Sequence, residues 1–262
     1  MSRCAIALLA LALAIPARAQ DADKVGKDKA PVVAKKAVAE ALKKKSAAIT
    51  EVAVVTVRDK IEATFEGVLR KDLAAVKGTA EVYAKSAAYL VHSGDKFEPP
   101  EALRGQEAAV AAAFKNPAVI LNDLGRLSAA ASYLEDGSLD GKSCKVIHLT
   151  ADEPLLEQHI KDISQRTAGV LKEAAQGLDF GNITGYFDKK TSVSAYKMWV
   201  DKATLLVCKI EWEFKPVIKK ESLPPGVPLI KLEALTTIQF SKWDETVAFD
   251  IPAPINAKWN LK

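Results

Sequence analysis

The chain has 262 residues, of which 27% are charged, and its formal net charge is +4. This length suits one large domain or two small ones. The charge is too balanced to indicate nucleic-acid binding. No C-x-x-C, H-E-x-x-H or phosphate-loop pattern occurs, and His92, His148 and His159 are far apart in the sequence. We therefore expect no nucleic acid, no metal and no cofactor.

Residues 1–19 have the pattern of an export signal. Arg3 precedes the apolar run Ala5–Ile15, and Ala17-Arg18-Ala19 fits an A-x-A cleavage site. The run is too short for a transmembrane helix, which needs about 20 residues. Cys4 precedes the run, whereas the lipidated cysteine of a lipoprotein lies at the cleavage point. We expect cleavage after Ala19 and a soluble periplasmic protein; a buried N-terminal helix is the alternative.

Residues 20–51 form a basic segment rich in lysine and alanine. Its first ten residues resemble a flexible tail, and Pro31–Ile49 can form a helix with Val38 and Leu42 on one side. A solvated helix is the simpler interpretation. The alternative is transient contact of residues 24–45 with an anionic membrane surface or an acidic partner, because this stretch carries eight lysines.

Residues 52–262 are expected to form a single domain that begins with strands. Apolar and polar residues alternate with a period of two, which is typical of strands that bury one face. Two segments have this period, Ile61–Arg70 and Val76–Lys85, and Ala87–His92 is a third strand-like run. The short connections predict an antiparallel meander, because parallel strands need longer crossovers. Gly67, Gly78 and Ala80 should leave space above the sheet, for a closely packed helix or for a cavity.

Helical patterns interrupt the strands in the middle of the chain. Glu101–Phe114 is rich in alanine, and a second helix fits Asn116–Leu127. Strands resume near Ala131–Leu134 and at Ser143–Thr150, with a turn at Leu139–Lys142 between them. The pattern thus combines an antiparallel sheet with inserted helices.

The next segment, Leu155–Leu171, predicts an amphipathic helix that packs against the sheet. Thr150 and Glu153 are spaced as a capping box, and Asp152 is a competing N-cap. His159 lies on the apolar stripe of this helix. We expect it to be a core histidine with a hydrogen-bonded nitrogen rather than a catalytic base.

Ser194–Phe214 is the clearest pair of strands in the chain, with a polar turn at Asp201–Thr204. In its second arm, apolar residues alternate with mostly charged ones, so one face of the strand is apolar. The apolar side carries Leu206, Cys208, Ile210, Trp212 and Phe214.

After this hairpin, the proline-rich loop Pro216–Pro228 leads to a strand at Leu232–Phe240. Thr246–Ile251 is expected to be the last strand, which makes about eight strands in all. Two cysteines, Cys144 and Cys208, lie in this domain. A disulfide between them and two buried thiols are equally compatible with the sequence.

Three phrases of the sequence resemble the LolA-like superfamily of bacterial periplasmic carriers of lipids and lipoproteins. They are Leu139–Leu149 (LDGKSCKVIHL), Met198–Leu206 (MWVDKATLL) and Phe240–Pro252 (FSKWDETVAFDIP). The similarity covers about residues 55–254. It implies an α+β fold in which an incomplete antiparallel β-barrel of about eight or more strands carries helices on its concave face. The resemblance also implies an apolar cavity for acyl chains.

The apolar strand faces are the candidate ligand-binding surface. If the sheet curves as the resemblance implies, these faces share its concave side. The residues are Phe65, Leu69, Val82, Ile210, Trp212, Phe214, Ile238 and Phe240. We predict that they line a cavity for a lipid or an acylated protein, because such ligand sites are mainly apolar.

Two hypotheses differ in what covers this face. In the first, the protein is an envelope carrier whose cavity binds a lipid. In the second, it is a structural or partner-binding envelope protein whose own helices fill the face and leave no room for a ligand. A third hypothesis, an enzyme, is disfavoured, because the sequence shows no nucleophile with a recognisable base. We therefore assign no catalytic residue.

Overall fold

The computed structural model describes residues 28–57, 59–166, 180–223, 225 and 232–261. The expected signal, residues 1–19, and its cleavage after Ala19 lie outside the described residues. The end of the helix expected to reach Leu171 and residues 224 and 226–228 of the expected loop also lie outside them. Residues 216–218, which were expected to begin this loop, instead belong to a strand. None of the helices in the described ranges is long and apolar enough to cross a membrane.

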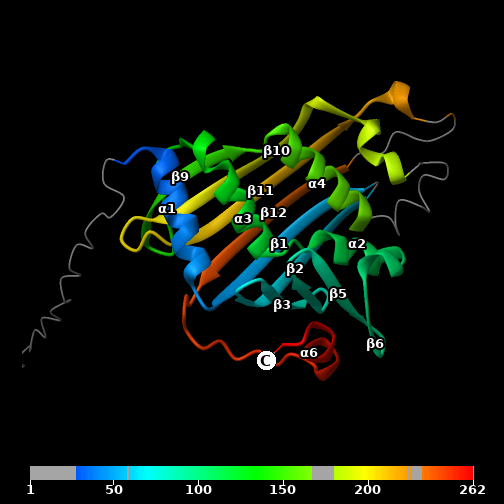
Figure 1. Ribbon diagram of the computed structural model, residues 1–262, viewed down its shortest axis with the longest axis horizontal. Helices are drawn as coiled ribbons and strands as arrows, with labels where there is room; N and C mark the ends of the chain where they lie inside the picture. Colours follow the sequence, from blue (N-terminus) through cyan, green and yellow to red (C-terminus); the bar gives the residue numbers. More distant parts are fainter. Residues whose placement is uncertain (1–27, 58, 167–179, 224, 226–231, 262) are drawn as a thin grey trace, which may run out of the picture.

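One open antiparallel sheet of twelve strands organises the described chain (Figure 1). The order across the sheet is β6-β5-β4-β3-β2-β1-β12-β11-β10-β9-β7, and β8 pairs with β9. The strands are β1 (Ala47–Val57), β2 (Asp59–Arg70), β3 (Leu73–Gly78), β4 (Val82–Lys85), β5 (Ala88–Ser93), β6 (Lys96–Glu98), β7 (Ser132–Tyr133), β8 (Gly137–Leu139), β9 (Lys142–Thr150), β10 (Phe187–Asp201), β11 (Val207–Ile218) and β12 (Leu232–Ser241). An incomplete barrel in an α+β fold was the predicted class, and the structure confirms it.

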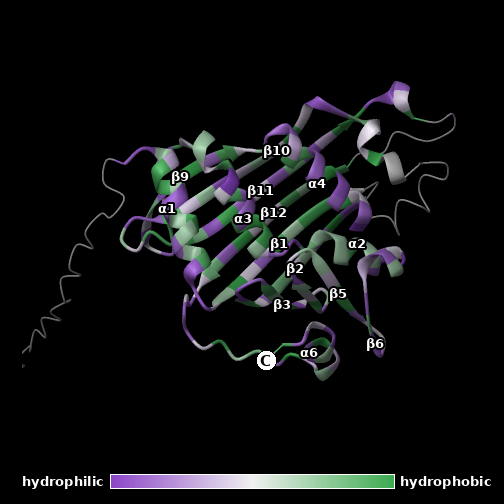
Figure 2. Cartoon of the chain, in the orientation of Figure 1, coloured by the Kyte–Doolittle hydropathy of each residue, from purple (hydrophilic) through white to green (hydrophobic). Residues whose placement is uncertain are grey.

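The long strands bury every second side chain, as their alternating sequences predict. In β12 the residues facing the core alternate regularly with partly or fully exposed ones, and Figure 2 shows the same alternation along the neighbouring strands. The predicted hairpin is formed by β10 and β11, with Ile210 and Trp212 facing inward. Val207 is also buried, and the register of β10 and β11 shifts beside it, between Trp199 and Val200.

Helices cover one face of this sheet, which we call the covered face (Figure 1). Phe65, Ile210 and Ile238 point into it. The α-helices of the described chain are α1 (Ala30–Lys43), α2 (Gly105–Ala113), α3 (Pro117–Leu127), α4 (Glu153–Arg166) and α6 (Ala253–Trp259). The 3-10 helices are η1 (Pro100–Ala102), η2 (Ser128–Ala130), η3 (Phe180–Tyr186) and η4 (Lys220–Ser222). All but α6 among the α-helices pack over the covered face.

Local capping fixes where α3 and α4 begin. Asn116 accepts a hydrogen bond from the Ala118 amide on its Oδ1 atom, at 3.0 Å. Asp152 does the same for the Leu155 amide, also at 3.0 Å. Asp152 is therefore the N-cap of α4, and α3 spans the residues that the sequence predicted.

Helix α1 corrects one expectation. The basic segment was expected to form a solvated helix through Ile49, but α1 ends at Lys43 and β1 begins at Ala47. One face of α1, including Val33 and Ala37, is fully buried in the core. The helix is therefore an integral part of the fold, because its alanines allow close packing on α3 and the sheet.

The predicted strand Val76–Lys85 is also a correction, because it consists of two strands, β3 and β4. Thr79 turns back to β2, where its amide donates to the Thr64 carbonyl at 2.9 Å and its Oγ1 accepts from the Thr64 amide at 2.9 Å. The sequence keeps a period of two across this turn and therefore hides it. Because of this split and the short strands β6, β7 and β8, the sheet has more strands than the eight that were expected.

The C-terminal segment is the third correction, because Thr246–Ile251 forms no strand. Instead, Val247, Phe249 and Ile251 pack with α6 on the face of the sheet opposite the covered face. They meet a second core there, formed by Val68, Ala75, Tyr83, Leu90 and Ile255. The alternation that resembled a strand therefore reflects contact with a second apolar surface.

Candidate functional site

All eight predicted ligand-binding residues share the covered face. They are between 0% and 6% exposed, and all belong to the main hydrophobic core. Phe65 and Leu69 lie on β2, Val82 on β4, Ile210, Trp212 and Phe214 on β11, and Ile238 and Phe240 on β12. The structure thus brings together residues that the sequence could only place on separate strands. Their role in ligand binding stays a prediction.

The space expected above the small residues is not present. A Cβ atom on Gly67 would lie 2.0 Å from the carbonyl oxygen of Ala75, and one on Gly78 would lie 2.1 Å from that of Thr64. These glycines allow β2 and β3 to approach each other closely, so they leave no room for a ligand. Ala80 lies in the turn between β3 and β4, partly buried against the main core. The covered face is filled by its own helices.

A polar cluster lies inside this apolar core, between α3, α4 and the sheet. His159 of α4 is at its centre, with Nδ1 2.8 Å from the Ser194 hydroxyl and Nε2 3.2 Å from Asp123 Oδ2. Tyr196 donates its hydroxyl to the same Asp123 oxygen at 3.3 Å, and Trp212 Nε1 donates to Ser194 at 2.9 Å. All five side chains are buried. The expected hydrogen-bonded core histidine is confirmed.

Ser194, His159 and Asp123 have the residue types of a catalytic triad. Each of them is less than 5% exposed. Burial, and then the nearby positive charge of Lys115, lowers the pKa of His159 to about 4. The imidazole is therefore neutral near pH 7, but no substrate can reach the serine in this conformation. These hydrogen bonds connect α3 and α4 to β10 and β11.

Two further charged side chains, Glu51 and Lys115, are buried beside this cluster. Glu51 of β1 accepts the Lys115 amide on Oε1 at 3.0 Å. Burial raises the pKa of Glu51 well above its usual range. Lys115 Nζ lies 3.7 Å from the centre of the Trp212 ring and 4.0 Å from Asp123 Oδ2, and burial lowers the pKa of Lys115 to about 8. Within the described residues, Glu51 Oε2 and Lys115 Nζ have no hydrogen-bond partner.

Arg166 ends the described part of α4 and connects this interior to a cavity. Its guanidinium donates to the carbonyls of Ala112 and Phe114 and to Asp162. It also lies 5.3 Å from the ring centre of Tyr89. Arg166 is 5% exposed, so it is held by groups from α2, α4 and β5 together.

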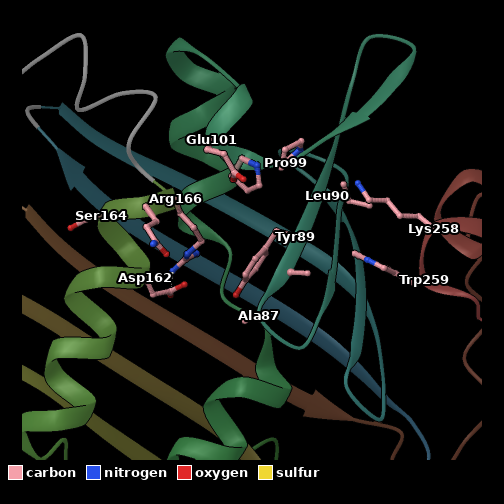
Figure 3. Close-up of a pocket in the computed structure, with 13 residues that line it drawn as sticks. Ala87, Tyr89, Leu90, Pro99, Glu101, Asp162, Ser164, Arg166, Lys258 and Trp259 are labelled. Atoms are coloured by element: carbon pink, nitrogen blue, oxygen red, sulfur yellow. Dashed lines mark hydrogen bonds and ion pairs between the residues drawn. The ribbon is translucent and has the colours of Figure 1, made fainter. Parts of the chain in front are cut away.

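A cavity of about 580 Å³ lies beside Arg166 and Tyr89. Its walls come from β5, η1, the last turn of α4, and α6. Figure 3 shows Asp162 and Arg166 facing Tyr89, with Lys258 and Trp259 of α6 beyond it. The remaining lining residues are mostly small or apolar: Ala87, Ala88, Leu90, Pro99, Pro100, Glu101, Ser164 and Gln165. The volume lies in the range typical of small-molecule sites, about 300–1,000 Å³.

Tyr89 separates this cavity from the main core. One side of its ring lines the cavity, and its ring centre lies 6.4 Å from that of Phe114. Phe114 in turn packs edge-on against Phe65 of the predicted site, at 5.3 Å. The cavity and the predicted apolar surface are thus adjacent, with two aromatic side chains between them.

This cavity and part of the polar cluster were not predicted from the sequence. The cavity is built from β5 and η1, which are close in sequence, and from the distant helices α4 and α6. The burial of Glu51 could have been found from the sequence, because Glu51 occupies an inward position of β1 in phase with Ile49 and Ala53. No sequence pattern indicates the burial of Lys115. The described residues contain no group of three His, Cys, Asp or Glu side chains that could hold a metal ion.

No family model matches this chain, and no curated protein matches its sequence. Solved structures that resemble it include the Mycobacterium tuberculosis lipoprotein LppX, with 11% identity over 84% of this chain and 99% of that chain, at a TM-score of 0.40. LprF from Mycobacterium bovis has 12% identity over 86% and 97%, with a TM-score of 0.36. A LolA superfamily protein from Nitrosomonas europaea has 13% identity over 87% and 97%, with a TM-score of 0.28. Because these TM-scores are low, the proposals below rest on the geometry of this chain.

Proposed function

We propose that this protein binds a lipid, or the acyl chain of a lipidated protein, and carries it within the cell envelope without catalysing a reaction. The observation that carries the proposal is the cavity of about 580 Å³ next to the main core. An acyl chain gains roughly 0.8 kcal/mol for each methylene that leaves water. The cavity wall is partly apolar and adjoins a larger apolar surface, which suits such a ligand.

The acyl chain enters this cavity and reaches the covered face past Tyr89 and Phe114. The eight predicted residues then form the inner end of the site. For this, α2 has to move away from the sheet. Helix α2 packs largely through alanines, which bury less apolar area than larger side chains. Its displacement also has to break the hydrogen bonds from Arg166 to the carbonyls of Ala112 and Phe114. The envelope location rests on the export signal that the sequence of residues 1–19 predicts.

The first test is mass spectrometry of organic extracts from the purified protein, together with binding of a fluorescent fatty acid. We expect a co-purifying lipid and saturable binding of the probe. Ala88→Trp places bulk at an exposed position in the cavity wall and should weaken probe binding while the melting temperature is kept. The matched control is Ala129→Trp, at an exposed alanine of η2. Absence of both lipid and probe binding would exclude the carrier function.

The alternative is a structural or partner-binding envelope protein that holds no ligand. It is favoured by one specific observation: none of the eight predicted residues lines the cavity of about 580 Å³, and the helices fill the face that these residues form. In this case the extracts contain no lipid, the probe does not bind, and Ala88→Trp behaves as Ala129→Trp does.

A further inference from the structure

Helix α1 has two faces of different chemistry. Its inner face consists of alanines and valines that are buried in the core. Its outer face is exposed and carries Val32, Lys35, Lys36, Ala39, Leu42 and Lys43. Val32 and Leu42 are 42% and 43% exposed. Apolar and basic side chains are therefore interspersed along the whole length of the outer face.

The charge around this helix is strongly positive. Residues 28–45 include six lysines and two acidic residues, Asp28 and Glu40. Asp28 pairs with Lys36 at 2.6 Å, and Glu40 pairs with Lys43 at 2.7 Å. Lys44 also pairs with Asp244, at 2.8 Å. Three lysines of the segment thus remain in excess.

Exposed apolar residues of β7 extend this outer face. The Tyr133 hydroxyl donates to the Asp28 carbonyl at 2.7 Å, which places the strand beside the start of α1. Tyr133 and the following Leu134 are 37% and 42% exposed. Together with Val32 and Leu42, they are four of the seven large hydrophobic side chains that the described residues expose. Exposed apolar side chains thus concentrate on and beside α1.

We propose that the outer face of α1, with Tyr133 and Leu134, rests on the surface of an anionic phospholipid bilayer. Lysines attract such a surface, and apolar and aromatic side chains between them enter its interfacial layer. This contact goes beyond the carrier function and does not depend on it.

The shape of the surface favours a bilayer over an acidic protein. A protein partner usually inserts anchor side chains into pockets. The cavity found beside Leu42 has a volume of only about 10 Å³. A surface with lysines and single apolar residues along a helix suits a fluid layer that adapts to it.

The test is sedimentation of the protein, purified as it occurs in the cell, with two kinds of vesicle. One kind is phosphatidylcholine alone, and the other contains phosphatidylglycerol as well. We expect binding to the anionic vesicles, little binding to the neutral ones, and loss of binding in high salt. One lysine near such a surface raises the partition coefficient about fivefold, so Lys35→Gln with Lys36→Gln should lower it about 25-fold. Val32→Ser with Leu42→Ser should lower it as well.

Matched controls carry the same changes elsewhere on the surface. Lys161→Gln with Lys190→Gln removes two exposed lysines, and Val193→Ser with Leu235→Ser removes two exposed apolar side chains. We expect both controls to bind the vesicles as the unaltered protein does. Equal binding to neutral and anionic vesicles would overturn the proposal, and so would control variants that lose as much binding as the α1 variants. All these positions are exposed, so circular dichroism should report an unchanged fold.

Discussion

At the scale of single residues, His159 shows how a polar group is accommodated in an apolar core. Both ring nitrogens have partners, and Lys115, Asp123 and Tyr196 surround the ring. Burial and the Lys115 charge lower its pKa from 6.5 to about 4. The fold therefore favours the neutral imidazole, whereas the unfolded chain binds a proton at the usual pKa.

This difference predicts a specific loss of stability in acid. Between pH 6.5 and 4, the unfolded state binds more protons at His159 than the native state does, so acidification favours unfolding. The shift corresponds to roughly 3 kcal/mol. His159→Gln removes this titration. Urea unfolding at the two pH values should show that the free energy of unfolding falls by roughly 3 kcal/mol more in the natural protein than in the variant. Equal losses in both proteins would contradict the prediction.

The two cysteines give a second prediction at this scale. Cys144 and Cys208 are free, buried thiols, and the expected burial of Cys208 is confirmed. Burial raises the pKa of the Cys208 thiol to about 12 and raises that of Cys144 as well. Because the thiolate is the reactive form, iodoacetamide should modify neither cysteine in the native protein at pH 7 and both after denaturation. Rapid native labelling of Cys208 would show that its thiol is not buried as described.

At the scale of elements, the β2–β3 pair depends on the absence of a side chain at Gly67. Gly67→Ala would place its Cβ 2.0 Å from the Ala75 carbonyl oxygen, so the strands must separate. We expect a loss of at least about 1–3 kcal/mol in the free energy of unfolding.

Gly125 of α3 is the matched control for this substitution. A Cβ there would lie 3.5 Å from Val38 Cγ1, which is an ordinary contact. Alanine also suits a helix interior better than glycine does, by roughly 0.5–1 kcal/mol. Gly125→Ala should therefore raise the melting temperature, whereas Gly67→Ala lowers it. If the two variants melt alike, the close approach of β2 and β3 is not what requires glycine.

Elements with a strong local signal could be predicted from the sequence. The β10–β11 hairpin has a clear period of two, and α3 has Asn116 as an N-cap and Pro117 at its first position. The turn between β3 and β4 could not be predicted, because alternation continues through Thr79 without a break. The mistaken last strand, Thr246–Ile251, has alternating apolar residues because they contact the second core.

The candidate site was only partly predictable for a related reason. Which strand faces are apolar is a local property, so the eight residues were found and do share a face. The cavity depends on how β5, η1, α4 and α6 meet, and no local pattern records that. The expected space above Gly67 and Gly78 was wrong because composition does not show how closely two backbones approach.

At the scale of the whole molecule, apolar surface is buried on both faces of the half of the sheet that contains the short strands β3, β4 and β5. Ile255 of α6 is fully buried in the second core. Ile255→Ala should leave a cavity there and lower the free energy of unfolding by roughly 2–5 kcal/mol. Chemical denaturation measures this loss. An exposed neighbour, Ala257→Ser, should have little effect, and a similarly small effect of Ile255→Ala would mean that α6 is not part of the stable fold.

The pairing of β1 with β12 has a consequence for biogenesis. The first strand of the sheet lies between β2 and the last strand, with Ala48 opposite Ser241 and Val57 opposite Leu232. While the polypeptide is still being synthesised, β2 to β6 can pair locally. The pairing of β1 with β12 has to wait until residues 232–241 have been made. Contacts that join distant parts of a chain form slowly, because a long loop must close first. The nascent polypeptide therefore remains incompletely folded throughout its synthesis and needs protection from aggregation until its final strand is in place.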